Sequence, residues 1–292
     1  MKIYFHSDLD GSCSAYWVLK HIKPRNTECI PVDYDKPFDI SSVQSDESVY
    51  ILDFCPPPEK MRELLGITHD VIWIDHHISS IERYKNFGYE ISGVRQVGIA
   101  ACLLTWGWVT DSPYVSPINP LEAVLQPDNL FDSAPDFVQL LADFDTFELQ
   151  LGDASLKFAY ALMAMDYTPQ GSLWRLMDRF PDVVQPTLRS GHQILRYKRK
   201  YAEDILKSYS WETIFEGYEC LVVNTGKVTH DFFRSIETPY DMFITTIFDG
   251  GMFDVRLYSN TVDVSEIAMR YGGGGHKRAA GFRTKMFCWG KK

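Results

Sequence analysis

The chain has 292 residues, which is enough for two domains, and its 45% hydrophobic and 23% charged residues are ordinary for a soluble globular protein. Its formal net charge of −10 argues against a protein that grips a long nucleic-acid duplex, because such proteins usually present a basic surface. The charge is compatible with a short phosphate-bearing substrate, since bound metal ions would reverse the field around local carboxylates.

The cysteines and the N-terminus indicate the compartment. Six cysteines occur without a Cys-x-x-Cys spacing, so we interpret them as free and mostly buried thiols, which suit a reducing environment. The first residues become charged too early for a signal peptide, and no apolar run reaches the roughly 18 residues of a membrane span. We therefore expect a cytoplasmic protein with no membrane insertion.

Strand-like and helix-like segments alternate over the first part of the chain. Residues 2–6, 48–53 and 71–75 are short apolar runs, rich in β-branched and aromatic side chains, as strands are. A helical stretch follows the first run at about 15–22, and another, at about 57–65, opens with prolines. This alternation predicts a mainly parallel sheet flanked by helices, with ligands at the carboxyl ends of its strands.

The second half of the chain changes character after a long helix. Residues 98–180 look helical, and a Lys- and Arg-rich helical run follows. Beyond it, runs at 212–217, 219–224, 242–249 and 252–259 look like strands, with a hairpin turn at Gly250 and Gly251, a short helix at 262–270 and a last strand near 279–284. We expect an N-terminal domain, a connecting helix and a smaller α/β domain with a mixed sheet, at 1–187, 188–210 and 211–292.

Acidic and histidine residues follow each of the predicted N-terminal strands. In chain order they are His6, Asp8 and Asp10, then Asp53, then Asp75, His76 and His77. Asp and His are good ligands for Mn²⁺ and similar divalent ions, and an aspartate behind them can orient an imidazole. Each cluster alone also fits a helix cap or a polar turn. Taken together at one sheet edge, they favour a metal site.

Two further clusters extend this set. Asp143 and Asp145 follow an apolar helix, where capping of the helix end is the alternative interpretation. With this pair included, the number of ligands suits two metals that share a bridging carboxylate. Gly272–Gly275, followed by His276, Lys277 and Arg278, would let backbone amides approach an anion closely, with a flexible loop as the alternative.

In this order, the clusters resemble the DHH-DHHA1 phosphoesterase family, which includes nanoRNases that degrade short oligonucleotides, pAp phosphatases, RecJ-type exonucleases and cyclic-dinucleotide phosphodiesterases. The resemblance spans nearly the whole chain. The matching residues are His6-x-Asp8-x-Asp10-Gly11, Ile51-Leu52-Asp53, Ile74-Asp75-His76-His77, Asp263–Ala268 and Gly272–Phe282.

The resemblance implies an N-terminal domain that holds two divalent ions, chiefly Mn²⁺, with Mg²⁺ or Co²⁺ as alternatives. One ion would be held by His6 and Asp8. The second would be held by Asp10, His76 and a further aspartate, for which we expect Asp143, with Asp145 as the alternative. Asp53 would bridge the ions, and Asp75 would orient an imidazole. His77 would face the scissile phosphate, either as a phosphate ligand or as a general acid.

The resemblance also implies substrate contacts in the C-terminal domain, from Gly274, Gly275 and His276. The family often reads Ser-Leu-Arg-Ser before its last helix, whereas here the residues are Arg256-Leu257-Tyr258-Ser259. A shift of two places keeps an arginine on the same face of a strand, so we expect Arg256 to reach the substrate together with Arg278. Tyr258 is an alternative contact, by stacking or hydrogen bonding.

Three functions follow from the resemblance. The first is a metal-dependent phosphodiesterase or exonuclease that hydrolyses short single-stranded oligonucleotides through metal-activated water. The second is a phosphatase or phosphodiesterase for a small nucleotide, such as pAp or a cyclic or linear dinucleotide. The third is a catalytically silent nucleotide-binding protein, disfavoured because all the ligands are present. We expect no extended duplex binding, and a homodimer is one option for the aromatic helical middle.

Overall fold

The computed structural model describes residues 1–23, 26–34, 36–115, 127–226 and 228–286. The chain divides into two compact units, Met1–His192 and Gln193–Lys292. In the described ranges, no helix combines the length and the apolar character needed to cross a bilayer. The five cysteines within these ranges are free thiols, and Cys288 lies outside them.

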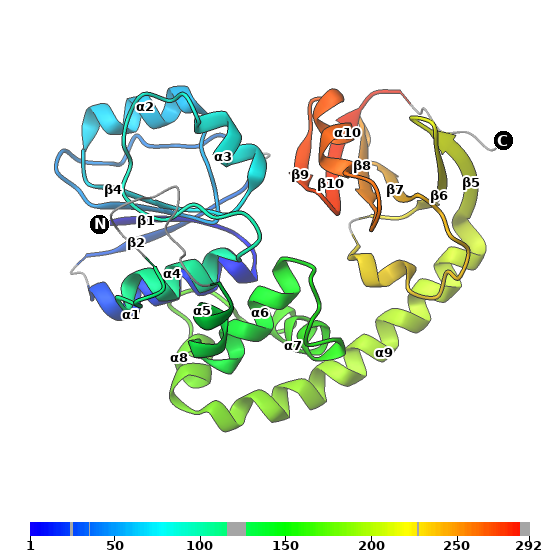
Figure 1. The fold of residues 1–292 in the computed structure, drawn as a ribbon, viewed down its shortest axis with the longest axis horizontal. Coiled ribbons are helices and arrows are strands. Elements are labelled where there is room, and N and C mark those ends of the chain that lie inside the picture. Colours follow the sequence, from blue (N-terminus) through cyan, green and yellow to red (C-terminus); the bar gives the residue numbers. More distant parts are fainter. Residues whose placement is uncertain (24–25, 35, 116–126, 227, 287–292) are drawn as a thin grey trace. The chain divides into compact units, whose positions relative to one another are not determined.

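The first unit is built on a four-stranded sheet in which all strands are parallel (Figure 1). The order is β2-β1-β3-β4, with β1 Lys2–His6, β2 Glu28–Val32, β3 Val49–Leu52 and β4 Val71–Ile74. The central strands β1 and β3 are buried along nearly their whole length. They are apolar runs without alternation because both faces of the sheet are covered.

Helices cover both faces of this sheet (Figure 1). On one face, α2 (Pro58–Ile67) inserts Met61 and Leu64 among strand side chains that include Tyr4, Ile51 and Trp73, and α3 (Ile78–Tyr84) follows β4. On the other face, α1 (Leu9–Ile22) packs against β1 and against α4 (Ala101–Val109). This layered arrangement leaves the carboxyl edge of the sheet for polar residues.

A helical layer completes the first unit. It contains α5 (Pro127–Ser133), α6 (Asp136–Asp145), α7 (Asp153–Met163), α8 (Ser172–Arg179) and the 3-10 helix η1 (Pro181–Val183). Helix α6 packs against α7, α4 and α1, so its C-terminal residues belong to the same body as the sheet. The long helix α9 (Val184–Tyr209) contains the boundary between the two units.

The second unit has a six-stranded mixed sheet in the order β5-β6-β7-β8-β10-β9. The strands are β5 Ser210–Phe215, β6 Tyr218–Asn224, β7 Met242–Phe248, β8 Phe253–Tyr258, β9 Gly274–His276 and β10 Ala279–Thr284. Only the pairing of β6 with β7 is parallel among these strands. Helix α10 (Val264–Arg270) covers one face, and the 3-10 helix η2 (His230–Phe233) contributes to the core on the other.

The expected fold class is confirmed, with a parallel sheet flanked by helices in the first unit and a mixed sheet in the second. The turn at Gly250 and Gly251 does join β7 to β8. Strand β2 was not predicted from the sequence, and it contains Pro31, which a central strand excludes but an edge strand tolerates. In the structure, β2 is the edge strand and Pro31 lies opposite Phe5 of β1.

Candidate metal centre

Three neighbouring strands deliver candidate ligands to one edge of the first sheet. His6 is the last residue of β1, Asp53 directly follows β3, and Asp75 directly follows β4. Because these strands are adjacent and parallel, their carboxyl ends lie side by side. Residues that are far apart in the sequence therefore converge at this edge.

The start of α1 brings two more carboxylates to the same edge. Asp8 caps the helix by accepting a hydrogen bond from the Gly11 amide at 3.0 Å, while its other oxygen lies 2.7 Å from His6 Nδ1. Gly11 has no side chain for a steric reason, since a Cβ there would lie 2.2 Å from the carbonyl oxygen of His6. The His-x-Asp-x-Asp-Gly spacing thus packs the first turn of α1 directly onto the end of β1.

Asp10 is anchored by the N-terminus of α4. Its carboxylate accepts hydrogen bonds from the amides of Ala101 at 2.8 Å and Cys102 at 2.7 Å. One of its oxygens also lies 3.6 Å from His76 Nε2. The unpaired amides at a helix N-terminus favour a negative group, so α4 fixes this carboxylate while leaving it directed at the site.

Asp53 occupies the centre of the cluster. Its Oδ1 lies 3.2 Å from His76 Nε2 and 3.7 Å from His77 Nδ1, and its Oδ2 lies 3.5 Å from His6 Nδ1. The side chain is buried, and the backbone takes the left-handed conformation with φ of 56°. A non-glycine residue in this region carries a conformational cost, which is common where a side chain must be aimed at a functional site.

The expected ligand Asp143 is corrected by the structure. Asp145, the alternative, lies in the cluster and Asp143 does not. Asp145 Oδ2 lies 3.3 Å from His76 Nε2. The Asp143 carboxylate instead accepts hydrogen bonds from the amides of Gln150 at 2.6 Å and Leu151 at 3.0 Å, and from the Ser155 hydroxyl. Residues two apart on a helix point roughly 200° apart, so only one of the pair can face the sheet edge.

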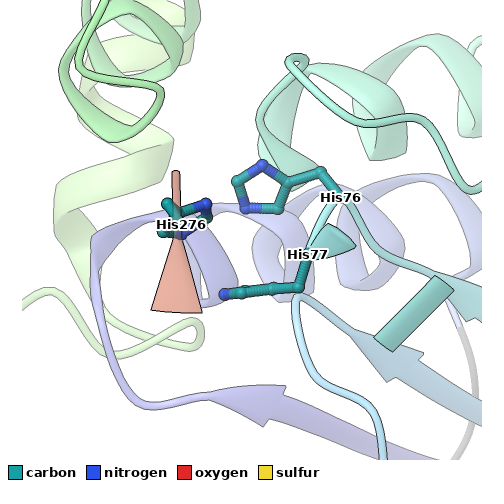
Figure 2. A group of neighbouring side chains, drawn as sticks. All are labelled: His76, His77 and His276. Carbon is teal, nitrogen blue, oxygen red and sulfur yellow. The ribbon is translucent and has the colours of Figure 1, made fainter. Parts of the chain in front are cut away.

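His76 and His77 follow β4 as consecutive residues, with ring centroids 4.8 Å apart (Figure 2). They differ in their partners, since His76 faces the carboxylates of Asp53 and Asp145 whereas His77 Nδ1 lies 2.8 Å from Asp75 Oδ1. The same Asp75 oxygen accepts the His76 and His77 amides at 2.7 and 3.1 Å. Asp75 therefore holds both the backbone and one imidazole of the triplet in place.

The crowding of carboxylates changes the protonation of the site. Burial, reinforced by the charge of Asp53, raises the pKa of Asp10 to about 7. Burial and then the charge of Asp10 also raise the pKa of Asp145 well above its ordinary value. For His6, burial alone would lower the pKa, but the charges of Asp8 and Asp53 outweigh it and raise the pKa to about 11. The raised pKa values show that the cluster does not readily hold all its carboxylates ionised at once, and bound cations would favour the ionised forms.

Two buried oxygens test whether metal ions fit this site. Asp53 Oδ1 and Asp145 Oδ2 are both shielded from solvent, and neither accepts a well-formed hydrogen bond from the described residues. Buried polar atoms without such a bond are costly, and a coordinated cation would satisfy them. The residues His6, Asp8 and Asp53 form one group whose possible ligand atoms lie within 4.8 Å of one another, and Asp10, Asp53 and His76 form another. The donor set fits divalent ions that accept oxygen and imidazole ligands.

The candidate substrate residues lie on the last strands of the second unit. Gly274, Gly275 and His276 form the edge strand β9, which pairs with β10, and Arg278 lies in the turn between these strands. A Cβ at Gly275 would lie 2.6 Å from Ala280 Cα, and its φ is 139°, so this glycine is required by strand packing as well.

Arg256 and Tyr258 on β8 have different environments. Two guanidinium nitrogens of Arg256 lie 3.0 and 3.1 Å from the two carboxylate oxygens of Asp254, and this pair is partly exposed. Tyr258 is buried, and its hydroxyl donates a hydrogen bond to the Val228 carbonyl at 2.5 Å. The structure therefore corrects the alternative that Tyr258 contacts substrate, because its ring and hydroxyl are both used within the unit.

Two residues near the centre were not identified from the sequence. Asp33 accepts a hydrogen bond from the Ser7 hydroxyl, and its Oδ1 lies 3.9 Å from His6 Nε2. The ring of Tyr34 lies against those of His6 and His77. Both residues directly follow β2, so the signal that would have found them is a fourth strand ending at the same edge.

Comparison with known proteins supports the resemblance. No family model matches the chain. The chain is similar to the oligoribonuclease NrnB of Bacillus subtilis (strain 168), with 22% identity over 306 aligned positions that cover 96% of this chain and 71% of the relative. This similarity extends over nearly the whole chain. The similarity and the motifs together support the resemblance to DHH-DHHA1 family phosphoesterases.

Solved structures also match the chain along nearly its whole length. An exopolyphosphatase-related protein from Bacteroides fragilis matches with a TM-score of 0.50 and 14% identity, covering 98% of this chain and 87% of that one. RecJ from Thermus thermophilus, in complex with Mn²⁺, matches with a TM-score of 0.47 and 14% identity, covering 97% of this chain and 49% of that one.

Proposed function

We propose that this protein is a metal-dependent phosphodiesterase of the DHH-DHHA1 family that hydrolyses short single-stranded oligonucleotides, with water as the nucleophile and two divalent ions bound. One observation carries the proposal: Asp53 is buried between two groups of candidate ligands and belongs to both. A carboxylate shared by two ions would hold them close together, as two-metal phosphoryl transfer needs. The named activity of the relative, an oligoribonuclease, supports the substrate class.

The ligand assignment follows the two groups. His6 and Asp8 would hold one ion, and Asp10, His76 and Asp145 would hold the second, with Asp53 contributing to both. Mn²⁺ suits this mixture of oxygen and imidazole donors. Bound divalent ions would neutralise the phosphate oxygens and lower the pKa of a water molecule between them.

His77 is proposed to bind the scissile phosphate. Asp75, itself buried, fixes the His77 ring by accepting a hydrogen bond from its Nδ1 atom. The other ring nitrogen, Nε2, is then left to donate a hydrogen bond to a phosphate oxygen. Burial alone would lower the pKa of His77, but the adjacent Asp75 carboxylate raises it. A raised pKa favours the imidazolium, which is the form suited to an anionic substrate.

The second unit is proposed to bind the nucleotide part of the substrate. Gly274 and Gly275 lie on the edge strand β9, which has one side unpaired within the sheet, and His276, Arg278 and Arg256 add groups that can donate to phosphate. Positive side chains here would offset the acidic character of the chain, which has a net charge of −10. The limited number of such residues suits a short ligand better than a long strand.

The test is an activity assay on the purified chain with Mn²⁺. A labelled ladder of oligoribonucleotides, from dinucleotides upward, is offered alongside pAp and cyclic and linear dinucleotides. We expect stepwise shortening with the shortest oligomers consumed fastest. Hydrolysis of pAp or a cyclic dinucleotide alone would replace the oligonucleotide with that substrate, and no hydrolysis by folded protein with any divalent ion would refute the proposal.

A residue-level test uses Asp53→Asn with a matched control. Asp46→Asn serves as the control because Asp46 has the same left-handed backbone, with φ of 60° against 56° for Asp53, but is exposed. We expect Asp53→Asn to lose activity and bound Mn²⁺ while Asp46→Asn keeps both. Retention of both properties in Asp53→Asn would overturn the bridging assignment.

A further inference from the structure

Tyr34 is an exposed aromatic residue at the edge of the candidate metal centre. Its side chain is 51% exposed, yet its ring centroid lies 5.8 Å from that of His6 and 5.8 Å from that of His77. These two imidazoles belong to the proposed metal ligand set and to the proposed phosphate contact. Contact between a large ring and water is unfavourable, so a ring that stays exposed beside this site is a candidate for ligand binding.

Buried aromatic rings hold Tyr34 in position from behind. Its centroid is 4.7 Å from that of Phe54, which lies 5.7 Å from Phe38, which in turn lies 4.8 Å from Tyr4. Tyr4, Phe38 and Phe54 all belong to the core cluster under α2. The ring is therefore anchored on the core, which makes it a fixed surface with little side-chain entropy left to lose on binding.

A ring with a fixed position and an exposed surface, in contact with the proposed phosphate-binding residue His77, suits one chemical group above others. Every nucleobase has a flat π-face, and stacking on an aromatic side chain is tolerant of base identity. We propose that Tyr34 stacks on the nucleobase next to the scissile phosphate, so that the site selects nucleotides over phosphate esters that lack a base. The inference rests on the proposed function for the position of that phosphate.

The experiment compares a dinucleotide with two analogues in which one base or the other is replaced by an abasic residue. The Mn²⁺-loaded wild type is expected to show a KM about 10-fold lower for the intact dinucleotide than for at least one analogue, as loss of one base stack implies. Tyr34→Leu is expected to abolish that preference by raising KM for the intact dinucleotide. Tyr34→Phe keeps the ring and is expected to retain the preference.

Tyr89→Leu is the matched control, because Tyr89 is 59% exposed and also packs on a phenylalanine, Phe87. It should leave the preference intact. Bound Mn²⁺ and the melting temperature are measured for every variant. If Tyr34→Leu slows the intact and abasic substrates equally, or loses Mn²⁺, then Tyr34 only supports the structure and the inference is wrong. A wild type without any preference for the base would also overturn it.

A binding measurement separates this inference from the proposed function. A non-hydrolysable dinucleotide containing 2-aminopurine is titrated into the Mn²⁺-loaded protein, since stacking quenches the fluorescence of this base. Quenching that Tyr34→Leu removes supports the inference even if the protein hydrolyses no phosphodiester, in which case only the proposed function fails. Quenching that is unchanged in Tyr34→Leu overturns the inference even if hydrolysis is observed.

Discussion

The candidate metal centre of the first unit and the β9–β10 hairpin of the second unit are built by different means. In the first unit, the ligands come from separate segments that end at one sheet edge, and Asp10, Asp53 and His76 are buried. In the second unit, the candidate substrate residues are close in sequence, and Gly274, Gly275 and His276 remain partly exposed on an edge strand. The first region concentrates charged side chains, whereas the second region leaves the backbone of an edge strand partly accessible.

The difference reflects what each region has to bind. Metal ions require several ligand atoms held in a fixed geometry, so the first region uses burial, helix N-termini and a left-handed backbone at Asp53. A phosphate or nucleotide requires close approach to backbone amides, so the second region uses glycine. Variants in the first region should therefore affect chemistry and metal content, whereas those in the second should affect substrate affinity.

The largest effect is expected from Asp53→Asn. Because this carboxylate is placed between both groups of ligands, we expect a fall in kcat of about 1000-fold or more, which corresponds to the several kcal/mol attributed to metal catalysis. Metal content by atomic spectroscopy should fall in parallel, while the circular dichroism spectrum stays unchanged. An active Asp53→Asn variant would remove the distinction between the two regions.

The next comparison is between Asp145→Asn and Asp143→Ala, within the first unit. Asp145 faces His76, so its variant should lose activity by at least about 100-fold with little change in stability. Asp143 supports the amides of Gln150 and Leu151, so its variant should lose about 3 kcal/mol of stability. Chemical denaturation and kcat measure the two effects, and the opposite pattern would restore Asp143 as the ligand.

Two glycine variants compare the regions directly. Gly11→Ala would place a Cβ 2.2 Å from the His6 carbonyl oxygen, and Gly275→Ala would place one 2.6 Å from Ala280 Cα. Each is expected to cost about 1–3 kcal/mol, since backbone neighbours cannot move aside easily. Only Gly11→Ala should also weaken Mn²⁺ binding, measured by calorimetry. Equal loss of Mn²⁺ affinity in both variants would contradict the proposed division of roles.

The smallest effect is expected from Arg256→Gln. The Arg256–Asp254 pair is partly exposed, so its loss should change stability by less than about 1 kcal/mol. If Arg256 also donates to substrate, KM should rise about 10-fold with kcat unchanged. An unchanged KM would show that Arg256 forms an ion pair with Asp254 but does not bind the substrate.

The sequence predicted strands and site residues correctly wherever a local pattern of residues was sufficient. Apolar runs located β1, β3 and β4, and the residues that follow them, His6, Asp53 and Asp75, do lie at one edge. Prediction failed for β2, which contains Pro31, a residue that an edge strand tolerates but a central strand excludes. With β2 missed, its neighbour Tyr34 could not be associated with the site.

What the sequence alone determined is the set of chemical groups and the fold class that gathers them. Tertiary structure decided which members of that set meet. Asp143 and Asp145 are two residues apart on one helix, and only the packing of α6 against α4 and α1 determines which of them faces His76. Likewise, packing on Phe54 holds the exposed ring of Tyr34 beside His6 and His77. Local spacing sets the direction of a side chain on its own element, but the neighbour that it meets depends on how the elements pack.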